Sequence, residues 1–159
     1  MTNERRNAPA EDGAGSSAPA PDGTARSRVE SGRGPAILVA EDELINQKYI
    51  QSAIERFGYS CDVASDGGET LALMRKTRYD IVFLDMQMPV MSGEEVLQAV
   101  RSENLAADTH VIALTAYTAA ADRERYLSLG CHSCISKPIH VRLLKSMIED
   151  AVARKNGKA

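Results

Sequence analysis

Five short apolar runs alternate with longer amphipathic segments along most of this chain, and this alternation limits the fold more than any other feature of the sequence. The runs lie at residues 36–40, 61–64, 81–84, 111–114 and 134–136. Short runs rich in Val and Ile predict strands that are buried on both faces, although the second and fifth runs are weaker than the others. One intervening segment has Ile50, Ala53, Ile54 and Phe57 on a single helical face, and Gly58 is suited to end that helix.

Polar pairs and apolar stripes indicate further helices. Asp66 with Glu69, and Ser92 with Glu95, resemble capping boxes and predict the starts of the second and third helices. Residues 118–129 give the weakest helical pattern, because their first half is mostly Ala and charged residues. A final helix is predicted from an apolar stripe formed by Val141, Leu144, Ile148 and Val152.

Strands that alternate with helices in this way predict an α/β fold, in which a parallel sheet is covered by helices on both faces. Right-handed crossovers with one reversal of direction give a doubly wound, flavodoxin-like sheet with the strand order 2-1-3-4-5. In such a sheet, ligands bind at the carboxyl ends of the first and third strands, where the strand order reverses. The functional residues are therefore expected at that edge of the sheet.

The chain of 159 residues has room for one ordinary domain and a tail. Residues 1–34 are mainly Ala, Pro, Gly, Ser and charged residues, and Val29 is the only large aliphatic residue after Met1. Such a segment cannot bury enough apolar surface to offset its ordering entropy, so we expect it to be disordered. A solvated extension is the simpler interpretation, and a tether or docking arm is the functional alternative. We place the domain at residues 35–154 and a frayed end at 155–159.

Composition excludes several classes of protein. The formal net charge of -3 argues against a nucleic-acid partner, which would normally require a basic excess. No stretch approaches the roughly 18–20 apolar residues that a membrane span requires, and the N-terminus lacks the apolar core of a signal peptide. The three cysteines, an odd number, suit a reducing compartment better than a set of disulfides. We therefore expect a cytoplasmic protein with no membrane or nucleic-acid partner.

Charged and polar side chains follow four of the predicted strands. Glu41 and Asp42 follow the first strand, Asp85 the third, Thr115 the fourth and Lys137 the fifth. Carboxylates about 4 Å apart repel each other by about 4 kcal/mol at an effective dielectric constant near 20, so three of them together need a cation. An all-oxygen site with room for water and a phosphoryl oxygen suits Mg²⁺.

These residue types together indicate phosphoryl transfer. A carboxylate such as Asp85 can act as the nucleophile and form an aspartyl phosphate. The transferred group is anionic, so catalysis would consist mainly of positioning and charge stabilisation. Mg²⁺ would bind one phosphoryl oxygen, Lys137 a second and the Thr115 hydroxyl a third.

Four segments resemble response-regulator receiver domains, above all those attached to hybrid sensor kinases. The segments are ILVAEDELINQ at residues 37–47, YDIVFLDMQMPVMSG at 79–93, VIALTA at 111–116 and SKPI at 136–139. The resemblance covers about residues 35–154 and implies a domain that takes a phosphoryl group from phosphohistidine onto Asp85. It also implies that Asp42, Asp85 and the Gln87 backbone carbonyl bind Mg²⁺, and that Glu41 reaches the metal through water.

The resemblance further implies that Thr115 and Lys137 sense the phosphate, and that the Lys137–Pro138 peptide is cis.

Two positions depart from the family pattern. Receivers usually have an aromatic residue three positions before the lysine, whereas this chain has Cys134, so we do not expect the usual aromatic readout of phosphorylation. Tyr117, two residues after Thr115, is bulky for a place beside the attacking water and is expected to slow hydrolysis of the phosphate.

The spacing of Cys131 and Cys134 raises two other possibilities. A redox C-x-x-C motif normally lies at a helix start, whereas this pair precedes and enters the last predicted strand. A zinc site could include His132 or His140, but a second cysteine pair is missing. Buried or half-buried thiols are therefore expected. Three methionines that flank the acceptor are expected to pack its loop, namely Met86, Met88 and Met91.

We expect a stand-alone receiver that serves as a phosphorelay intermediate, shuttle or phosphate sink, because only a few residues follow the last helix. Its partners would be a histidine kinase, a histidine-phosphotransfer protein or both. It would be a monomer, with dimerisation on phosphorylation left open. A donor helix would dock on the first helix and on the loop of Pro138, contacting Ile45, Asn46, Lys48 and Tyr49.

This protein would not be an enzyme in the ordinary sense, because it would catalyse only its own phosphorylation and a slow dephosphorylation. Two alternative functions were weighed against it. A receiver-like interaction module that is never phosphorylated is disfavoured, because the acidic, hydroxyl and lysine residues of the site are all present. A phosphohydrolase with an aspartyl nucleophile would normally have a second acid two residues after the nucleophile, and this chain has Gln87 there.

Overall fold

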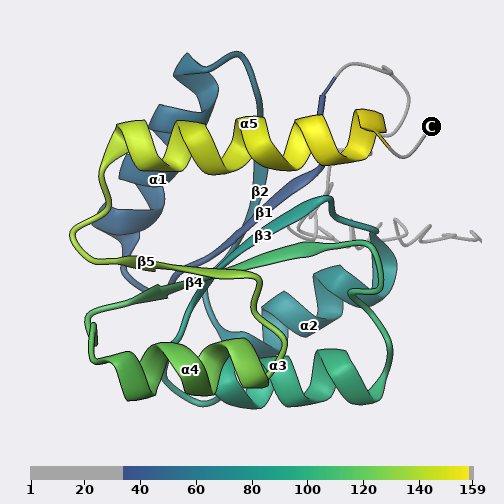
Figure 1. Ribbon diagram of the computed structural model, residues 1–159, viewed down its shortest axis with the longest axis vertical. Coiled ribbons are helices and arrows are strands. Elements are labelled where there is room, and N and C mark those ends of the chain that lie inside the picture. Colours follow the sequence, from purple (N-terminus) through teal and green to yellow (C-terminus); the bar gives the residue numbers. More distant parts are fainter. Residues whose placement is uncertain (1–33, 158–159) are drawn as a thin grey trace, which may run out of the picture.

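The computed structural model describes residues 34–157 as one parallel sheet of five strands with helices on both faces (Figure 1). The strand order is β2-β1-β3-β4-β5, so the predicted fold class and order are confirmed. The predicted disordered tail, residues 1–34, lies outside the described residues except for Gly34. The elements are, in chain order, β1 (Ile37–Ala40), α1 (Leu44–Arg56), β2 (Cys61–Ala64), α2 (Gly67–Lys76), β3 (Ile81–Asp85), α3 (Gly93–Ser102), β4 (His110–Thr115), α4 (Ala120–Ser128), β5 (Ser133–Ser136) and α5 (Val141–Gly157).

The central strands β1, β3 and β4 are apolar except at His110, Asp85 and Thr115, which lie at strand ends, because both faces of the sheet are covered. Helices α1 and α5 lie on one face, and α2, α3 and α4 lie on the other (Figure 1). In β1, Ile37 and Val39 pack with residues of α1 and α5, whereas Leu38 and Ala40 pack with residues of α2, α3 and α4. Successive side chains of a strand point to opposite faces, so the middle of a strand between two helical layers favours apolar residues on both sides.

The helix ends follow the predicted signals, with one difference. In α3 the Ser92 hydroxyl accepts from the Glu95 amide while the Glu95 carboxylate accepts from the Ser92 amide, which is a complete capping box. In α2 the Asp66 side chain accepts from the Glu69 amide as predicted. In a capping box the Glu69 carboxylate would accept from the Asp66 amide. It accepts instead from the amide of Ser65, at 2.7 Å.

Tertiary contacts stabilise the two helices at the C-terminal end of the chain. The weakly predicted helix α4 buries a single residue, Tyr126, and Arg125 forms an ion pair with Glu94 of α3 at 2.7 Å. Helix α5 continues to Gly157, and in its last turns Lys155 pairs with Asp80 at 2.9 Å next to β3. Within residues 34–157, no helix combines the length and the apolar character that a membrane span requires.

The loop between β3 and α3 packs closely against the strand that carries Asp85. Met86 and Met88 are buried and Met91 is half-buried against the same core, which confirms the predicted packing role of the methionines. Gly93 begins α3 so close to the strand that a Cβ atom there would lie 2.6 Å from both the Asp85 carbonyl oxygen and the Met86 Cα. Both are backbone atoms at the end of a buried strand, so they cannot move aside cheaply.

We predict that Gly93→Ala lowers the free energy of unfolding by about 1–3 kcal/mol, because the added methyl group displaces the end of β3. Gly157→Ala is the matched control, since a Cβ atom at Gly157 would have no neighbour within 4 Å. There the higher helix propensity of Ala should leave stability unchanged or slightly raised. Urea denaturation measures both variants, and equal stability of the two would show that α3 does not pack this tightly on β3.

Candidate functional site

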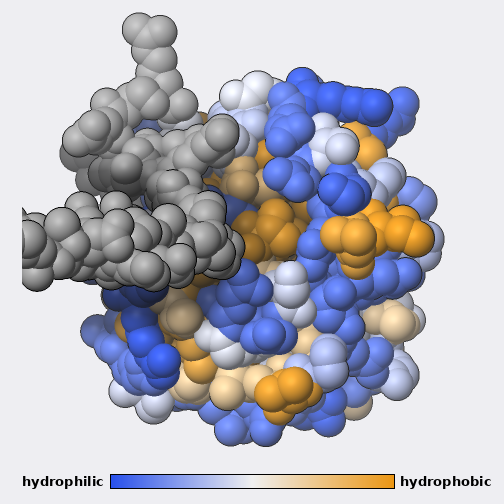
Figure 2. All heavy atoms as spheres, turned by 180° about the vertical axis from the view of Figure 1, so that it is seen from behind, coloured by the Kyte–Doolittle hydropathy of each residue, from blue (hydrophilic) through white to orange (hydrophobic). Residues whose placement is uncertain are grey.

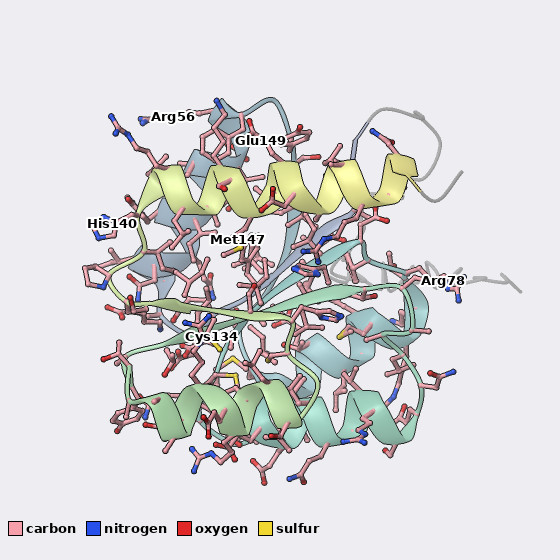
Figure 3. The ribbon with its side chains drawn as sticks, viewed as in Figure 1. Arg56, Arg78, Cys134, His140, Met147 and Glu149 are labelled. Atoms are coloured by element: carbon pink, nitrogen blue, oxygen red, sulfur yellow. The ribbon has the colours of Figure 1, made fainter. Side chains whose placement is uncertain are left out.

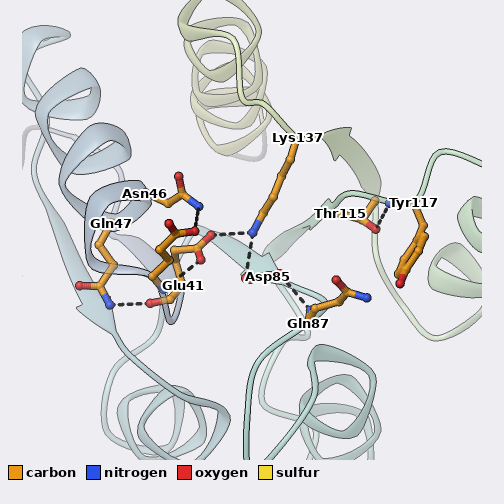
Figure 4. Close-up of polar contacts among 9 residues, drawn as sticks. Glu41, Asn46, Gln47, Asp85, Gln87, Thr115, Tyr117 and Lys137 are labelled. Atoms are coloured by element: carbon orange, nitrogen blue, oxygen red, sulfur yellow. Dashed lines mark hydrogen bonds and ion pairs between the residues drawn. The ribbon is translucent and has the colours of Figure 1, made fainter.

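The carboxyl ends of the strands bring the predicted site residues to one edge of the sheet. Glu41 and Asp42 follow β1, Asp85 ends β3, Thr115 ends β4 and Lys137 follows β5. Strands β1, β3, β4 and β5 are consecutive neighbours in the sheet, so these ends adjoin one another. Figure 4 shows the Lys137 side chain reaching across the edge to Glu41 and Asp85, with Thr115 on the neighbouring strand.

The ammonium group of Lys137 links two buried carboxylates. Its Nζ donates hydrogen bonds to Glu41 Oε2 and Asp85 Oδ2, each at 2.9 Å. The side chains of Glu41 and Asp85 are only 1% and 2% exposed. Burial opposes the charge of Lys137, but its hydrogen bonds to Asp85 and Glu41 outweigh burial and raise its pKa above the ordinary value. Lys137 therefore stays charged at neutral pH, and the peptide that joins it to Pro138 is cis.

Asp85 resists ionisation at this position. Burial raises the pKa of Asp85 to about 7, and the neighbouring charge of Glu41 adds to the effect. The backbone amide of Gln87, 2.9 Å from Asp85 Oδ1, and the Lys137 ammonium act in the opposite direction. A further cation beside Asp85 would favour its ionised form, and the ionised form is the nucleophile.

Asp42 completes a cluster of three carboxylates. Glu41, Asp42 and Asp85 each offer one oxygen, and these oxygens lie within 4.8 Å of one another. Asp42 is exposed, so the cluster is open to solvent on that side. Carboxylate oxygens in an open site suit Mg²⁺, which usually keeps several water ligands. The residues present therefore fit a magnesium ion, whereas the Gln87 carbonyl stays a prediction as a further ligand.

The Thr115 hydroxyl is placed to donate a hydrogen bond. Thr115 is 3% exposed, and its Oγ1 accepts from the Tyr117 amide at 3.0 Å. The hydroxyl hydrogen can still be donated to another acceptor, such as a phosphoryl oxygen. The Tyr117 side chain is 53% exposed. Cys134 pairs with Ala113 in the sheet and lies on the side of β5 that faces α4 (Figure 3), so a small thiol occupies the position of the usual aromatic residue.

The cysteines do not form a second functional centre among residues 34–157. Cys131 is buried and Cys134 is half-buried, as predicted, and neither is in a disulfide. Burial raises the pKa of Cys131 to about 12 and raises that of Cys134 as well, so both thiols are protonated. The His132 Nδ1 atom already accepts from the Val111 amide at 3.1 Å. The acidic cluster is the only group of three or more potential metal ligands in the part of the chain that the structure describes.

Gln47 contacts the site and was not predicted to do so. It lies in the first turns of α1, and its side-chain amide donates to the backbone carbonyl of Glu41. The sequence does contain a signal for it. Gln47 lies three residues before Ile50, on the face of the helix that is otherwise apolar and buried. A polar residue at such a position needs a buried hydrogen-bond partner.

Comparisons with known proteins agree with the described fold. Residues 37–149 match the family of the response regulator receiver domain. The polar-differentiation response regulator DivK of Brucella anthropi is 35% identical over 120 residues, which are 73% of this chain and 98% of that protein. Hybrid signal transduction histidine kinase K of Dictyostelium discoideum is 32% identical over 126 residues, which are 75% of this chain but only 10% of the kinase. The chain thus spans a small part of the hybrid kinases that it matches.

Solved receiver structures show the same arrangement of elements. The receiver domain of sensor histidine kinase PA1611 from Pseudomonas aeruginosa aligns with a TM-score of 0.70 and 27% sequence identity, over 76% of this chain and 99% of the PA1611 domain. That structure holds a magnesium ion in its active-site cleft. The Saccharomyces cerevisiae Ssk1 receiver was solved with the histidine phosphotransfer protein Ypd1. It aligns with a TM-score of 0.67 and 27% sequence identity, over 73% of this chain and 88% of the Ssk1 chain. From its sequence match and its fold, this chain belongs to the receiver-domain family of two-component signalling.

Proposed function

We propose that this receiver takes a phosphoryl group from a phosphohistidine onto Asp85, with Mg²⁺ as cofactor. The observation that carries the proposal is the position of Asp85 at the carboxyl end of β3. There its carboxylate lies within 4.8 Å of two others and contacts Lys137 at 2.9 Å. An acceptor of an anionic group needs a nucleophile with positive charge beside it. Here Lys137 provides one positive charge, and the carboxylates would hold the cation that provides the rest.

The proposed reaction exchanges one bond for another. A carboxylate oxygen of Asp85 attacks the phosphorus, and the bond between phosphorus and the donor's imidazole nitrogen breaks. The electron pair of that bond returns to the imidazole, which then takes a proton. Mg²⁺ on Asp42, Asp85 and the Gln87 carbonyl, with Glu41 acting through water, would supply the charge that balances the carboxylates and the phosphoryl oxygens.

Two residues of the chain bind the incoming group directly in this proposal. The Lys137 ammonium would turn from the carboxylates toward one phosphoryl oxygen, and the Thr115 hydroxyl would donate to another. Tyr117, which follows on the exposed loop after Thr115, would limit the approach of water to the aspartyl phosphate. The resulting phosphate would be passed on or stored, so we propose a relay intermediate, shuttle or phosphate sink. The relative DivK supports this role, since 98% of its length aligns with this chain.

An exposed apolar border around the site supports docking of a protein donor. Ile45 is 76% exposed in the first turn of α1, Tyr117 is 53% exposed after β4, and Val90 is 96% exposed in the loop after β3. Val90 has a φ of 69°, and the Met91 amide donates to the Pro89 carbonyl across it, which forms a tight turn. A β-branched residue is strained in that conformation, and strain of this kind gathers at functional sites.

These apolar side chains would contact a helix of a histidine kinase or a histidine-phosphotransfer protein. On the face that Figure 2 shows, apolar side chains form separate patches on a largely hydrophilic surface. The donor histidine must approach Asp85 in line with the breaking bond, so its helix has to lie beside this border. Cys134 is too small to report phosphorylation by the side-chain rotation that an aromatic residue makes in other receivers. The phosphorylated protein would therefore pass on its signal by phosphoryl transfer or by direct docking to a partner.

Asp85→Asn is predicted to abolish labelling by acetyl phosphate, because an amide is not a nucleophile for this reaction. Chelation of divalent cations by EDTA should abolish labelling of the wild type in the same way. Asp150→Asn, on the exposed side of α5, is the matched control and should be labelled like the wild type. Mass spectrometry of the intact protein measures the added phosphate. Undiminished labelling of Asp85→Asn would show that another residue is the acceptor.

Ile45→Glu is predicted to slow transfer from a phosphorylated protein donor by about tenfold or more, since it places a charge in an apolar contact. Charge reversal at Lys48 should act in the same direction. Labelling by acetyl phosphate, which needs no docking, should be unchanged. Leu127→Glu, at a position 40% exposed on α4, is the matched control and should transfer normally. An equal loss with both phosphate sources would mean that the substitution damaged the site and would contradict the docking surface.

A further inference from the structure

A polar side chain lies on the buried face of α1. Gln47 is 8% exposed, and its neighbours on the same face, Ile50 and Ile54, are fully buried. Burial of an amide group is unfavourable unless hydrogen bonds compensate for the loss of water. An apolar residue would pack at this position without that penalty. The presence of Gln47 is therefore explained by the groups that it binds.

Gln47 binds the end of β1 and the end of β2 together. Its Nε2 donates to the backbone carbonyl of Glu41 (Figure 4) and to Ser65 Oγ, the latter at 3.1 Å. The pairing of β1 with β2 and β3 ends at Ala40, so the Glu41 carbonyl lies beyond the ladder of the sheet. A buried carbonyl needs a partner, and the Gln47 side chain provides it.

That carbonyl belongs to the peptide that joins Glu41 to Asp42. The peptide is planar, so fixing the direction of its carbonyl also fixes the Cα atoms of both residues relative to it and leaves one backbone dihedral angle to set the direction of each side chain. The Glu41 carboxylate has further support, because it accepts from the Glu43 amide at 3.2 Å and from Lys137. Within residues 34–157, no hydrogen bond or ion pair holds the Asp42 side chain. The direction of Asp42 therefore depends on the backbone that Gln47 holds.

We infer that Gln47 is a positioning residue for the divalent-cation site, because it directs Asp42 into the acidic cluster through the peptide between Glu41 and Asp42. Gln47 does not itself offer a ligand to that cluster. The inference rests on the proposed magnesium site and adds a residue behind its ligands. Loss of such a residue typically weakens metal binding 10–100-fold.

Binding of Mn²⁺, followed by electron paramagnetic resonance with Mg²⁺ as competitor, measures this role without phosphoryl transfer. Gln47→Met keeps the length of the side chain, removes both hydrogen bonds and should raise the dissociation constant about tenfold. Ser65→Ala removes only the second bond and should raise it by less. Gln51→Met is the matched control, with the same substitution one turn later on α1, and should leave the dissociation constant unchanged.

A double-mutant cycle with Asp42→Asn separates positioning from a general loosening of the fold. If Gln47 acts through Asp42, Gln47→Met should have little further effect once Asp42 is replaced. The same fold-change in both backgrounds would contradict the inference, and so would wild-type affinity of Gln47→Met. If circular dichroism shows that Gln47→Met is unfolded, Ser65→Ala takes its place in the test. Wild-type affinity of Ser65→Ala for Mn²⁺ would then contradict the inference. A wild type that binds no Mn²⁺ would contradict the metal site itself, and the inference with it.

Discussion

The contact of one ammonium group with two buried carboxylates at the edge of the sheet is the interaction on which the rest of this site depends. A carboxylate removed from water is strongly destabilised unless it is paired, and Glu41 and Asp85 are almost fully buried. Lys137 pairs with both at 2.9 Å, but one positive charge does not balance two negative ones together with the nearby Asp42. The remaining negative charge suits a divalent cation, and in the proposed function that cation and Lys137 together offset the charge of the phosphoryl oxygens.

The parallel sheet makes this contact possible. Glu41, Asp85 and Lys137 are far apart in the sequence, and only strands that run in one direction bring the residues that follow them to a common edge. The two helical layers keep these strand ends in place, and Gly93 lets α3 begin directly against the strand that carries Asp85. Gln47 extends the same support to the loop after β1. A rigid scaffold therefore presents an open, negatively charged site, which is the arrangement that positional catalysis requires.

The sequence predicted the strands and the residues at their ends well, because both are local signals: an apolar run followed by a charged or hydroxyl residue. It predicted less well the helix ends and side-chain contacts that depend on segments far apart in the sequence. In the last turns of α5, Lys155 pairs with Asp80, and α4 buries only Tyr126 and pairs with α3 through Arg125 and Glu94. The hydrogen bond from the Ser65 amide to the Glu69 carboxylate and the contact of Gln47 with Ser65 follow from how β2 meets α1 and α2. No periodic pattern encodes such contacts, although a glutamine on an apolar helix face does mark one of them.

The central claim is that Asp85 becomes an aspartyl phosphate, and chemical mapping of the modified residue tests it most directly. Borohydride reduces an acyl phosphate to an alcohol, so it converts a phosphorylated aspartate to homoserine, which peptide mass spectrometry then locates. After incubation with acetyl phosphate and Mg²⁺, we expect homoserine at position 85 and at no other aspartate, and none when Mg²⁺ is chelated. Homoserine at a different position, with Asp85 unmodified, would contradict the account.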